Sequence, residues 1–191
     1  MGSRTLYLVR HGQYRMDPDE PKSGTLTALG RRQALRTGRR LRGIPITAVY
    51  HSDIVRAVET VKLIARYFPD QRLRSTALLR ETLPPTPGAV LGGQRISRAD
   101  KAEMRVQCER AFDRFFRVAR RGEHHEVLVT HGNLIRYLVR RALGDDPRKW
   151  YRYGIYQCSI TTVQIESRAL GPMLIGFNDI GHLPDPMQTM L

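Results

Sequence analysis

Short apolar runs alternate with amphipathic stretches of helical spacing along most of this 191-residue chain, and this alternation narrows its possible folds more than any other feature. The apolar runs have the length and composition of buried strands. They predict strands at residues 5–10, 46–51, 72–75, 126–130, 159–165 and 172–177. Alternating strands and helices are typical of proteins in which helices cover both faces of one sheet. The sequence therefore predicts a three-layer α/β/α sandwich with a mostly parallel central sheet and antiparallel strands near the C-terminus.

The segments between these strands predict helices at residues 26–42, 54–67, 98–121 and 134–143. Thr27 is suited to cap the start of the first helix and Gly43 its end, while Asp53 is a candidate N-cap for the second. Residues 82–97 are rich in Pro and Gly and predict a loop. Residues 178–191 predict an irregular tail. No internal repeat or interdomain linker interrupts the pattern, so residues 1–191 are expected to form a single domain.

The composition fits a soluble protein with a full core, because 41% of the residues are hydrophobic. No apolar run reaches the roughly 18 residues that a membrane-spanning helix needs, and the N-terminal residues do not have the order of regions found in a signal peptide. A cytoplasmic location is therefore the expectation, with no membrane partner. Cys108 and Cys158 lie far apart without CxxC spacing, which favours reduced thiols over a disulfide scaffold or a cysteine-based zinc site.

The net charge of +14 comes from 32 basic and 18 acidic residues, and nearly all the basic residues are Arg. Three explanations are open: attraction of a phosphorylated or otherwise acidic substrate, binding of nucleic acid, or a solvated basic surface. The Arg residues are spread through every segment, and the few aromatic residues are not interleaved with them as a base-stacking platform would require. Nucleic acid is therefore not expected to be the main partner.

Reactive residues follow three of the predicted strands. Residues 10–13 read Arg-His-Gly-Gln, residues 130–133 read Thr-His-Gly-Asn, and residues 51–53 read His-Ser-Asp with Arg56 one helical turn later. Because functional residues in such folds gather at the carboxyl ends of the strands, His11 and His131 are expected at the same edge of the sheet. A glycine after each histidine allows the backbone to approach a ligand closely.

A pocket with two His and two Arg side chains is suited to bind a phosphate dianion. The guanidinium group stays charged and its planar fork matches phosphate oxygens, which makes Arg10 and Arg56 candidate phosphate ligands beside His131. A neutral imidazole is a competent nucleophile towards phosphorus, so His11 is a candidate for a phosphohistidine intermediate. These groups could stabilise the transition state without a metal ion. Glu81, just before the Pro-rich loop, is the candidate general acid.

Other histidines have plainer interpretations. A histidine at a strand end is more often structural than catalytic, and the case for function depends on finding His11 and His131 together with two arginines. His124 and His125 are expected in an exposed turn, where further metal ligands are lacking. Whether His182 and the C-terminal tail reach the pocket is left open.

The segments 8–13, 51–60 and 129–132 resemble the signature of the histidine phosphatase (phosphoglycerate mutase-like) superfamily, in the same order and over nearly the whole chain. The resemblance implies the α/β sandwich, the nucleophile His11 and the proton donor Glu81. It also implies that no metal or other cofactor is needed. Residues expected to contact substrate are Arg10, Gln13, Arg56, His131, Gly132 and Asn133.

Residues 11–17, 78–81 and 133–143 are more specifically similar to the mitochondrial Ser/Thr protein phosphatase branch of that superfamily. Mutases usually carry Asn where this chain has Asp17, and residues 82–97 are shorter than their loop, which predicts an open site. Because the sequence begins almost at its first predicted strand, that branch's N-terminal anchor and multimerisation segment are not expected. The tail, from residue 178 to 183, looks more like small-molecule and bacterial members.

The preferred substrates are therefore phosphoserine and phosphothreonine proteins. Alternatives are small phosphorylated metabolites, phosphoglycerate interconversion, and a non-catalytic module that binds phosphate or nucleic acid. The oligomeric state is open, a homodimer included.

Overall fold

A computed structural model describes residues 2–15, 24–82, 90–91, 94–95 and 97–190. Its main sheet has six strands in the order β3-β2-β6-β1-β7-β8. β3, β2, β6 and β1 are mutually parallel, whereas β7 is antiparallel to β1 and β8 to β7. The strands span Ser3–Arg10 (β1), Ala48–His51 (β2), Leu73–Ser75 (β3), Glu123–Thr130 (β6), Ile160–Ile165 (β7) and Pro172–Asp179 (β8). This confirms the predicted sheet, including its antiparallel C-terminal strands.

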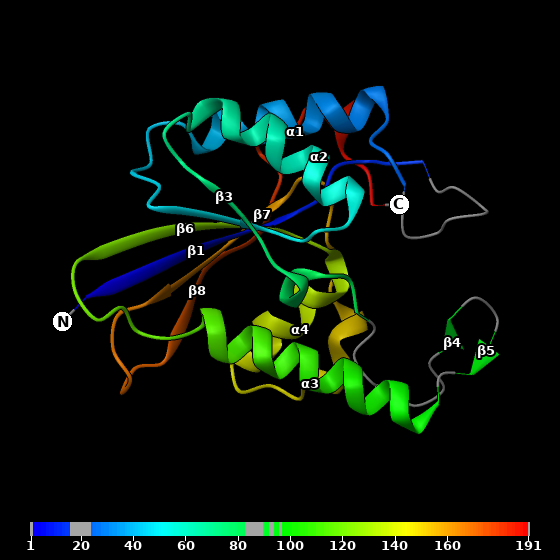
Figure 1. Ribbon diagram of the computed structural model, residues 1–191, viewed down its shortest axis with the longest axis vertical. Coiled ribbons are helices and arrows are strands. Elements are labelled where there is room, and N and C mark those ends of the chain that lie inside the picture. Colours follow the sequence, from blue (N-terminus) through cyan, green and yellow to red (C-terminus); the bar gives the residue numbers. More distant parts are fainter. Residues whose placement is uncertain (1, 16–23, 83–89, 92–93, 96, 191) are drawn as a thin grey trace.

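Two pairs of helices cover the two faces of this sheet (Figure 1). Helices α1 (Ala28–Leu41) and α2 (Val55–Ile64) lie on one face, and α3 (Arg98–Phe115) and α4 (Gly132–Ala142) lie on the other. Alternate side chains along each strand point to opposite faces, so one strand contributes to both cores. Val9, Val49, Val127 and Val129 join the core beneath α1 and α2, and Leu6, Leu8, Tyr50 and Leu128 join the one beneath α3 and α4.

The start of α1 is capped as predicted, but the start of α2 is not. The Thr27 hydroxyl accepts a hydrogen bond from the Gly30 backbone N–H, and Gly43 follows α1 with a φ of +93°. Asp53 does not cap α2, because its carboxylate accepts a hydrogen bond from Arg80 Nε at 2.7 Å. The backbone N–H of Ile54, the residue at the N-cap position, instead donates to Ser52 Oγ at 3.2 Å. That correction places the Ser52 hydroxyl at the helix start.

The end of α3 and the start of β6 also differ from the prediction. α3 ends at Phe115 because Phe116, with φ −88° and ψ 60°, leaves the helical conformation. Parallel pairing with β1 extends β6 back to Glu123, so His124 and His125 lie in a strand and not in an exposed turn. His125 Nδ1 is 3.1 Å from the hydroxyl oxygen of Tyr7.

Most of the predicted loop at 82–97 lies outside the described residues. Where that loop is described, Val90–Leu91 (β4) pairs with Gln94–Arg95 (β5) as a small antiparallel ladder, which the loop prediction did not include. In the described tail, a short 3₁₀ turn at Asp185–Met187 follows the end of β8. Among the described helices, none combines the length and the apolar character needed to cross a membrane.

Candidate active site

The carboxyl ends of β1 and β6 bring two imidazoles together. His11 follows the last residue of β1 and His131 follows the last residue of β6, and the backbone N–H of His11 donates to the Thr130 carbonyl at 2.9 Å. The two ring centroids are 5.0 Å apart. Arg56, in the first turn of α2, points its Nε at His11 Nε2 over 3.2 Å. The structure thus places three of the predicted site residues in one buried cluster.

The hydrogen bonds of His11 define its tautomer. Nδ1 lies 2.9 Å from the Gly12 carbonyl oxygen, which only accepts hydrogen bonds, so the proton is on Nδ1. Nε2 then carries a lone pair and accepts from Arg56. Burial, followed by the charges of Arg56 and Arg10, holds the pKa of His11 well below its usual value. His11 is therefore a neutral imidazole with its nucleophilic nitrogen on the side of Arg56.

His131 is fixed through Ser52. The hydroxyl oxygen of Ser52 accepts from the Ile54 backbone N–H and lies 2.9 Å from His131 Nε2. We assign the Ser52 hydroxyl as the donor to Nε2, and this assignment leaves the proton of His131 on Nδ1. Burial first, and then the electrostatic influence of His11 and the two arginines, hold the pKa of His131 well below normal. The side chain is a neutral donor through Nδ1.

Three donors of this cluster have no hydrogen-bond partner in the described part of the chain. They are Arg10 Nε, Arg56 Nη1 and His131 Nδ1, and all three atoms are buried. An unsatisfied buried polar group costs about 1–3 kcal/mol, more when it is charged. Arg10 is otherwise anchored, since its Nη1 donates to the carbonyls of Ile155 and Met190, each at 2.6 Å. Three buried donors without partners in one cluster, two of them on cationic side chains, are groups that a tetrahedral dianion would satisfy.

Glu81 lies beside this cluster, after the short 3₁₀ turn Ala77–Leu79. Part of its surface remains accessible, but protein atoms surround the carboxyl group. Desolvation by burial raises the pKa of Glu81 to about 7, against the opposing effects of the Thr82 backbone N–H and the guanidinium groups of Arg56 and Arg10. A carboxyl group with such a pKa can both give and take a proton near neutrality.

The three other predicted substrate contacts are placed less uniformly. Gly132 lies against Arg10, since a Cβ atom there would be 3.3 Å from Arg10 Nε. Asn133 Oδ1 accepts from Arg136 Nη1 at 3.0 Å. The contacts of Gln13 are directed at α1, because its side-chain oxygen accepts from the Thr27 hydroxyl at 2.7 Å and its backbone N–H donates to Gln33.

Gly12 packs against α1. A Cβ atom at Gly12 would lie 2.7 Å from the carbonyl oxygen of Gly30, so this glycine admits the close approach of the α1 backbone. The residue after His11 is thus constrained by helix packing.

Sequence reasoning missed several residues that complete the site. The Tyr14 ring meets the His11 ring edge-on at 5.1 Å, and Arg56 Cζ lies 4.7 Å from the Tyr14 ring centroid. Ser52 orients His131, and Arg136 interacts electrostatically with Glu81. Tyr14 lies three residues after His11 in the sequence, and this short separation is the feature from which its place in the site could have been predicted.

The C-terminal tail does reach the site, through Met190 and not through His182. The Met190 carbonyl contacts Arg10, whereas His182 Nε2 lies 3.0 Å from the Thr37 hydroxyl and 3.1 Å from the Cys158 carbonyl. Asp17 lies outside the described residues. Within the residues that are described, no group of three His, Cys, Asp or Glu side chains is arranged to hold a metal ion.

Comparisons with a family model and with individual known proteins point to the same family. A model of the histidine phosphatase superfamily (branch 1) matches residues 6–178. The chain is 36% identical over 187 residues to the mitochondrial serine/threonine-protein phosphatase PGAM5 of Mus musculus, covering 95% of this chain and 65% of that protein. It is 34% identical over 191 residues to the mitochondrial serine/threonine-protein phosphatase Pgam5 of Caenorhabditis elegans, again covering 95% and 65%. The chain thus spans slightly less than two thirds of the length of these two relatives.

A solved structure agrees in fold. The phosphoglycerate mutase from Plasmodium falciparum is 27% identical and superposes with a TM-score of 0.66, covering 97% of this chain and 96% of that one. The two curated relatives are both named as mitochondrial proteins, and this contradicts the cytoplasmic location expected from the sequence. That expectation depended on the lack of a targeting pattern, which is weak evidence of location in a chain that spans only part of its relatives.

Proposed function

This chain belongs to the histidine phosphatase superfamily, and from that premise we propose that it is a phosphatase which takes the phosphoryl group of phosphoserine or phosphothreonine in proteins onto His11. The proposal covers residues 1–191 as one catalytic domain that works without a metal ion. Its catalytic residues are His11, Arg10, Arg56, His131 and Glu81, with Gly132 and Asn133 beside the bound phosphate and Gln13 at its margin.

One observation supports this function above the others. The buried donors Arg10 Nε, Arg56 Nη1 and His131 Nδ1 lack partners in the described structure, and their side chains belong to the same cluster as a neutral His11. A phosphate dianion would accept from all three and would lie next to the imidazole that attacks it. Non-catalytic phosphate binding explains the donors equally well, but it does not explain a neutral nucleophile beside a carboxyl group whose pKa is raised to about 7.

In the first step, His11 Nε2 attacks phosphorus and the bond between phosphorus and the seryl or threonyl oxygen breaks. Arg56 gives up its hydrogen bond to Nε2 and donates to the phosphoryl oxygens, together with Arg10 and His131. The Glu81 carboxyl group transfers its proton to the departing oxygen, so that an alcohol leaves and a carboxylate remains.

In the second step, water attacks the phosphorus atom of phosphohistidine and the bond from nitrogen to phosphorus breaks. The Glu81 carboxylate takes a proton from that water and returns to its starting state. Inorganic phosphate and neutral His11 are the products. The raised pKa of Glu81 suits both halves of the cycle, because the group must release a proton and then regain it.

The protein substrate is carried over from the relatives that are named serine/threonine-protein phosphatases. A phosphoseryl or phosphothreonyl side chain presents the same dianion as a small phosphomonoester, so the phosphate pocket alone does not distinguish the two. The distinction must come from residues around the pocket and from the rest of the substrate.

The test is hydrolysis of phosphoserine and phosphothreonine peptides and of an aryl phosphate, all in EDTA, by the wild type and by His11→Ala. His125→Ala is the matched control, since it removes an imidazole from the same sheet at a distance from the site. We expect wild type and control to be active and His11→Ala to be inactive but folded, with phosphate trapped on the wild-type protein in an alkaline quench, because phosphohistidine is stable in base and labile in acid. Full activity of His11→Ala would show that His11 is not the nucleophile. A large preference for small metabolites, or interconversion of phosphoglycerates, would overturn the protein substrate.

A further inference from the structure

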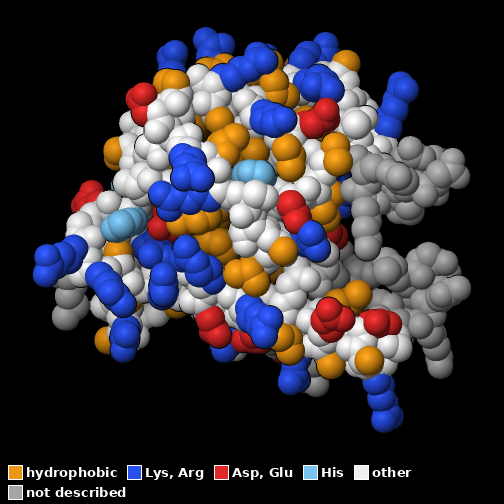
Figure 2. Space-filling model, viewed as in Figure 1, with side chains coloured by type: hydrophobic (Ala, Val, Ile, Leu, Met, Phe, Trp, Pro, Cys, Tyr) orange, Lys and Arg blue, Asp and Glu red, His pale blue; other side chains and the backbone are white. Residues whose placement is uncertain are grey.

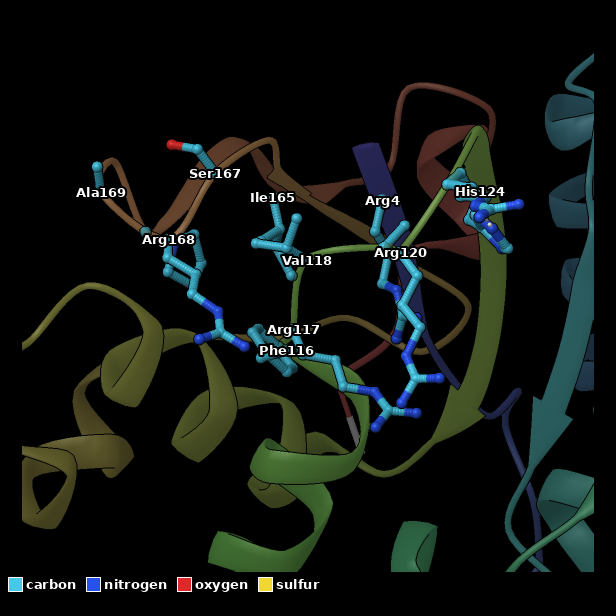
Figure 3. Close-up of a pocket in the computed structure, with 14 residues that line it drawn as sticks. Arg4, Phe116, Arg117, Val118, Arg120, His124, Ile165, Ser167, Arg168 and Ala169 are labelled. Atoms are coloured by element: carbon cyan, nitrogen blue, oxygen red, sulfur yellow. Dashed lines mark hydrogen bonds between the residues drawn. The ribbon is translucent and has the colours of Figure 1, made fainter. Parts of the chain in front are cut away.

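An open groove of about 1540 Å³ lies at the end of the sheet opposite the candidate active site. It is formed by the segment that follows α3, the turn between β7 and β8, and the starts of β1 and β6 (Figure 3). Arg4, near the start of β1, lines the groove, and Arg10, at the end of the same strand, belongs to the active site. At about 3.3 Å per residue, six residues of strand separate the two by roughly 20 Å. A ligand in the groove would therefore leave the phosphate pocket free.

The charged side chains that line this groove, among the described residues, are all basic. Five arginines and one histidine line it, and its described lining includes no Asp or Glu. Arg117, Arg120, Arg121 and Arg168 are exposed, and none of the four has a side-chain hydrogen bond or ion pair in the described part of the molecule. Figure 2 shows Lys and Arg side chains gathered over this end of the molecule, where β1 and β6 begin. Such a recess concentrates anionic ligands.

Arg4 holds the base of the groove together. It is 7% exposed, donates to the Phe115 carbonyl at 3.1 Å and pairs with Glu126 at 3.7 Å. Burial, outweighing the attraction of Glu126, lowers the pKa of Arg4, and the nearby charges of Arg117 and Arg114 add to this effect. The like charges are thus close enough to repel one another, and an anionic ligand would relieve that repulsion.

Between the arginines the groove is apolar. Phe116, Val118 and Ile165 lie between Arg168 on one side and Arg120 with Arg4 on the other (Figure 3). Leu170, in the adjoining turn, is 73% exposed. A ligand that fits this surface combines negative charges with apolar side chains.

We propose that this groove binds an acidic peptide segment in which carboxylates alternate with apolar side chains. The carboxylates would pair with Arg117, Arg120 and Arg168, and the apolar side chains would pack on Val118 and on the exposed Leu170 of the adjoining turn. Nucleic acid fits less well, because the aromatic ring of the floor, Phe116, is only 7% exposed and offers no face for a base to stack on. A bilayer fits less well because the apolar floor is recessed, whereas membrane-binding surfaces present their apolar groups outward.

The experiment measures binding of a dye-labelled peptide, in which Asp and Glu flank single Leu residues, by fluorescence anisotropy. We expect Arg117→Glu/Arg120→Glu to weaken its affinity by about tenfold or more. Arg32→Glu/Arg72→Glu is the matched control, since it changes the net charge equally at exposed positions away from the groove, and it should bind nearly as well as the wild type. A peptide with Ser in place of Leu should also bind more weakly.

Two further measurements separate this proposal from its rivals. Competition by single-stranded DNA or by anionic phospholipid vesicles at lower concentrations than the peptide would overturn it, as would equal losses in the groove variant and the control. Hydrolysis of an aryl phosphate by Arg117→Glu/Arg120→Glu should equal that of the wild type, because neither residue belongs to the active site. The peptide-binding measurement therefore tests the groove independently, even if the protein proves to have no phosphatase activity. Arg168→Glu, in the turn, repeats the binding test at a position where α3 is undisturbed.

Discussion

Each imidazole of the candidate active site has its proton placed by one neighbour. The Gly12 carbonyl keeps a proton on Nδ1 of His11, and the Ser52 hydroxyl, assigned as the donor to Nε2, leaves the proton of His131 on Nδ1. The two rings thus differ in what they offer a phosphate, since His11 presents a lone pair and His131 a donor. The histidines themselves were predictable from their place after buried strands, whereas Ser52 was not, because its contact depends on how β2 and β6 pair.

Ser52→Ala should lower kcat/KM about tenfold, the effect of losing one hydrogen bond of about 1–1.5 kcal/mol that orients a catalytic donor. Without the hydroxyl, His131 can place its proton on either nitrogen and no longer presents Nδ1–H reliably. Steady-state kinetics with a phosphopeptide measures this. Ser75→Ala, at an exposed strand end, is the control and should be unchanged. Equal kinetics in Ser52→Ala and the wild type would remove Ser52 from the positioning of His131.

Glu81→Gln should lower turnover of a phosphoseryl peptide about 10²–10⁴-fold, the usual contribution of a general acid. An aryl phosphate should be much less affected, because its leaving group departs readily as an anion. The pKa of about 7 adds a pH signature: the wild-type rate of the first step should fall as the pH rises above about 7, since the carboxyl group then loses its proton. Rapid-quench measurements of phosphoenzyme formation across pH test both statements. A loss of equal size for the two substrates would be incompatible with proton donation to the leaving group.

At the scale of elements, the sequence predicts the strands well and their surroundings less well. Buried strands such as β1 and β6 are evident as apolar runs, and the helices between them follow from amphipathic spacing. The ends of elements depend on tertiary contacts. β6 begins at Glu123 because β1 pairs with it that far, and α3 ends at Phe115 because the chain turns there towards β6. Neither contact has a local sequence signal.

The same limit applies to the close approach of α1 and the segment after β1. Gly30 packs its backbone on Gln13 so closely that a Cβ atom would overlap the Gln13 carbonyl oxygen. In the sequence, Gly30 is simply a glycine inside a predicted helix. Only the folded arrangement explains why the helix tolerates it.

Gly30→Ala should therefore destabilise the protein by about 1–3 kcal/mol through overpacking, or by roughly 2–4 °C in Tm for each kcal/mol. It should also lower activity, because the displaced segment leads directly from His11. Thermal unfolding followed by circular dichroism measures the first effect. The matched control is Gly176→Ala in β8, where a Cβ atom would meet nothing within 4 Å. Similar Tm values for the two variants would show that α1 adjusts freely at this contact.

At the scale of the whole molecule, the buried titratable groups predict how stability depends on pH. The pKa values of His11, His131 and His182 are all lowered by burial, so below about pH 6.5 the unfolded chain binds more protons than the folded one. The three histidines therefore lower the free energy of unfolding as the pH falls. Glu81 acts in the opposite direction between about pH 4.5 and 7, because its raised pKa keeps a proton in the folded state. With three histidines against one carboxyl group, acidification should destabilise the protein.

Tm should thus decrease between about pH 7.5 and pH 5, and the variants should alter this decrease in opposite senses. His11→Asn/His131→Asn should flatten the decrease, because it removes two groups that bind protons more weakly in the folded than in the unfolded state. Glu81→Gln should steepen it, because the opposing contribution is removed. Scanning calorimetry across this range measures the three slopes. Identical slopes would mean that other groups dominate the acid response.

The three unpartnered donors that make the pocket fit a phosphate ester do not distinguish the ester from what it becomes. Inorganic phosphate has the same shape and charge, so hydrolysis exchanges one good occupant for another. The alcohol product leaves with nothing to hold it, while phosphate stays among Arg10, Arg56 and His131. We therefore expect the departure of phosphate to limit turnover and added inorganic phosphate to inhibit it. The expected rate of such a pocket depends on the phosphate content of its surroundings as well as on the supply of substrate.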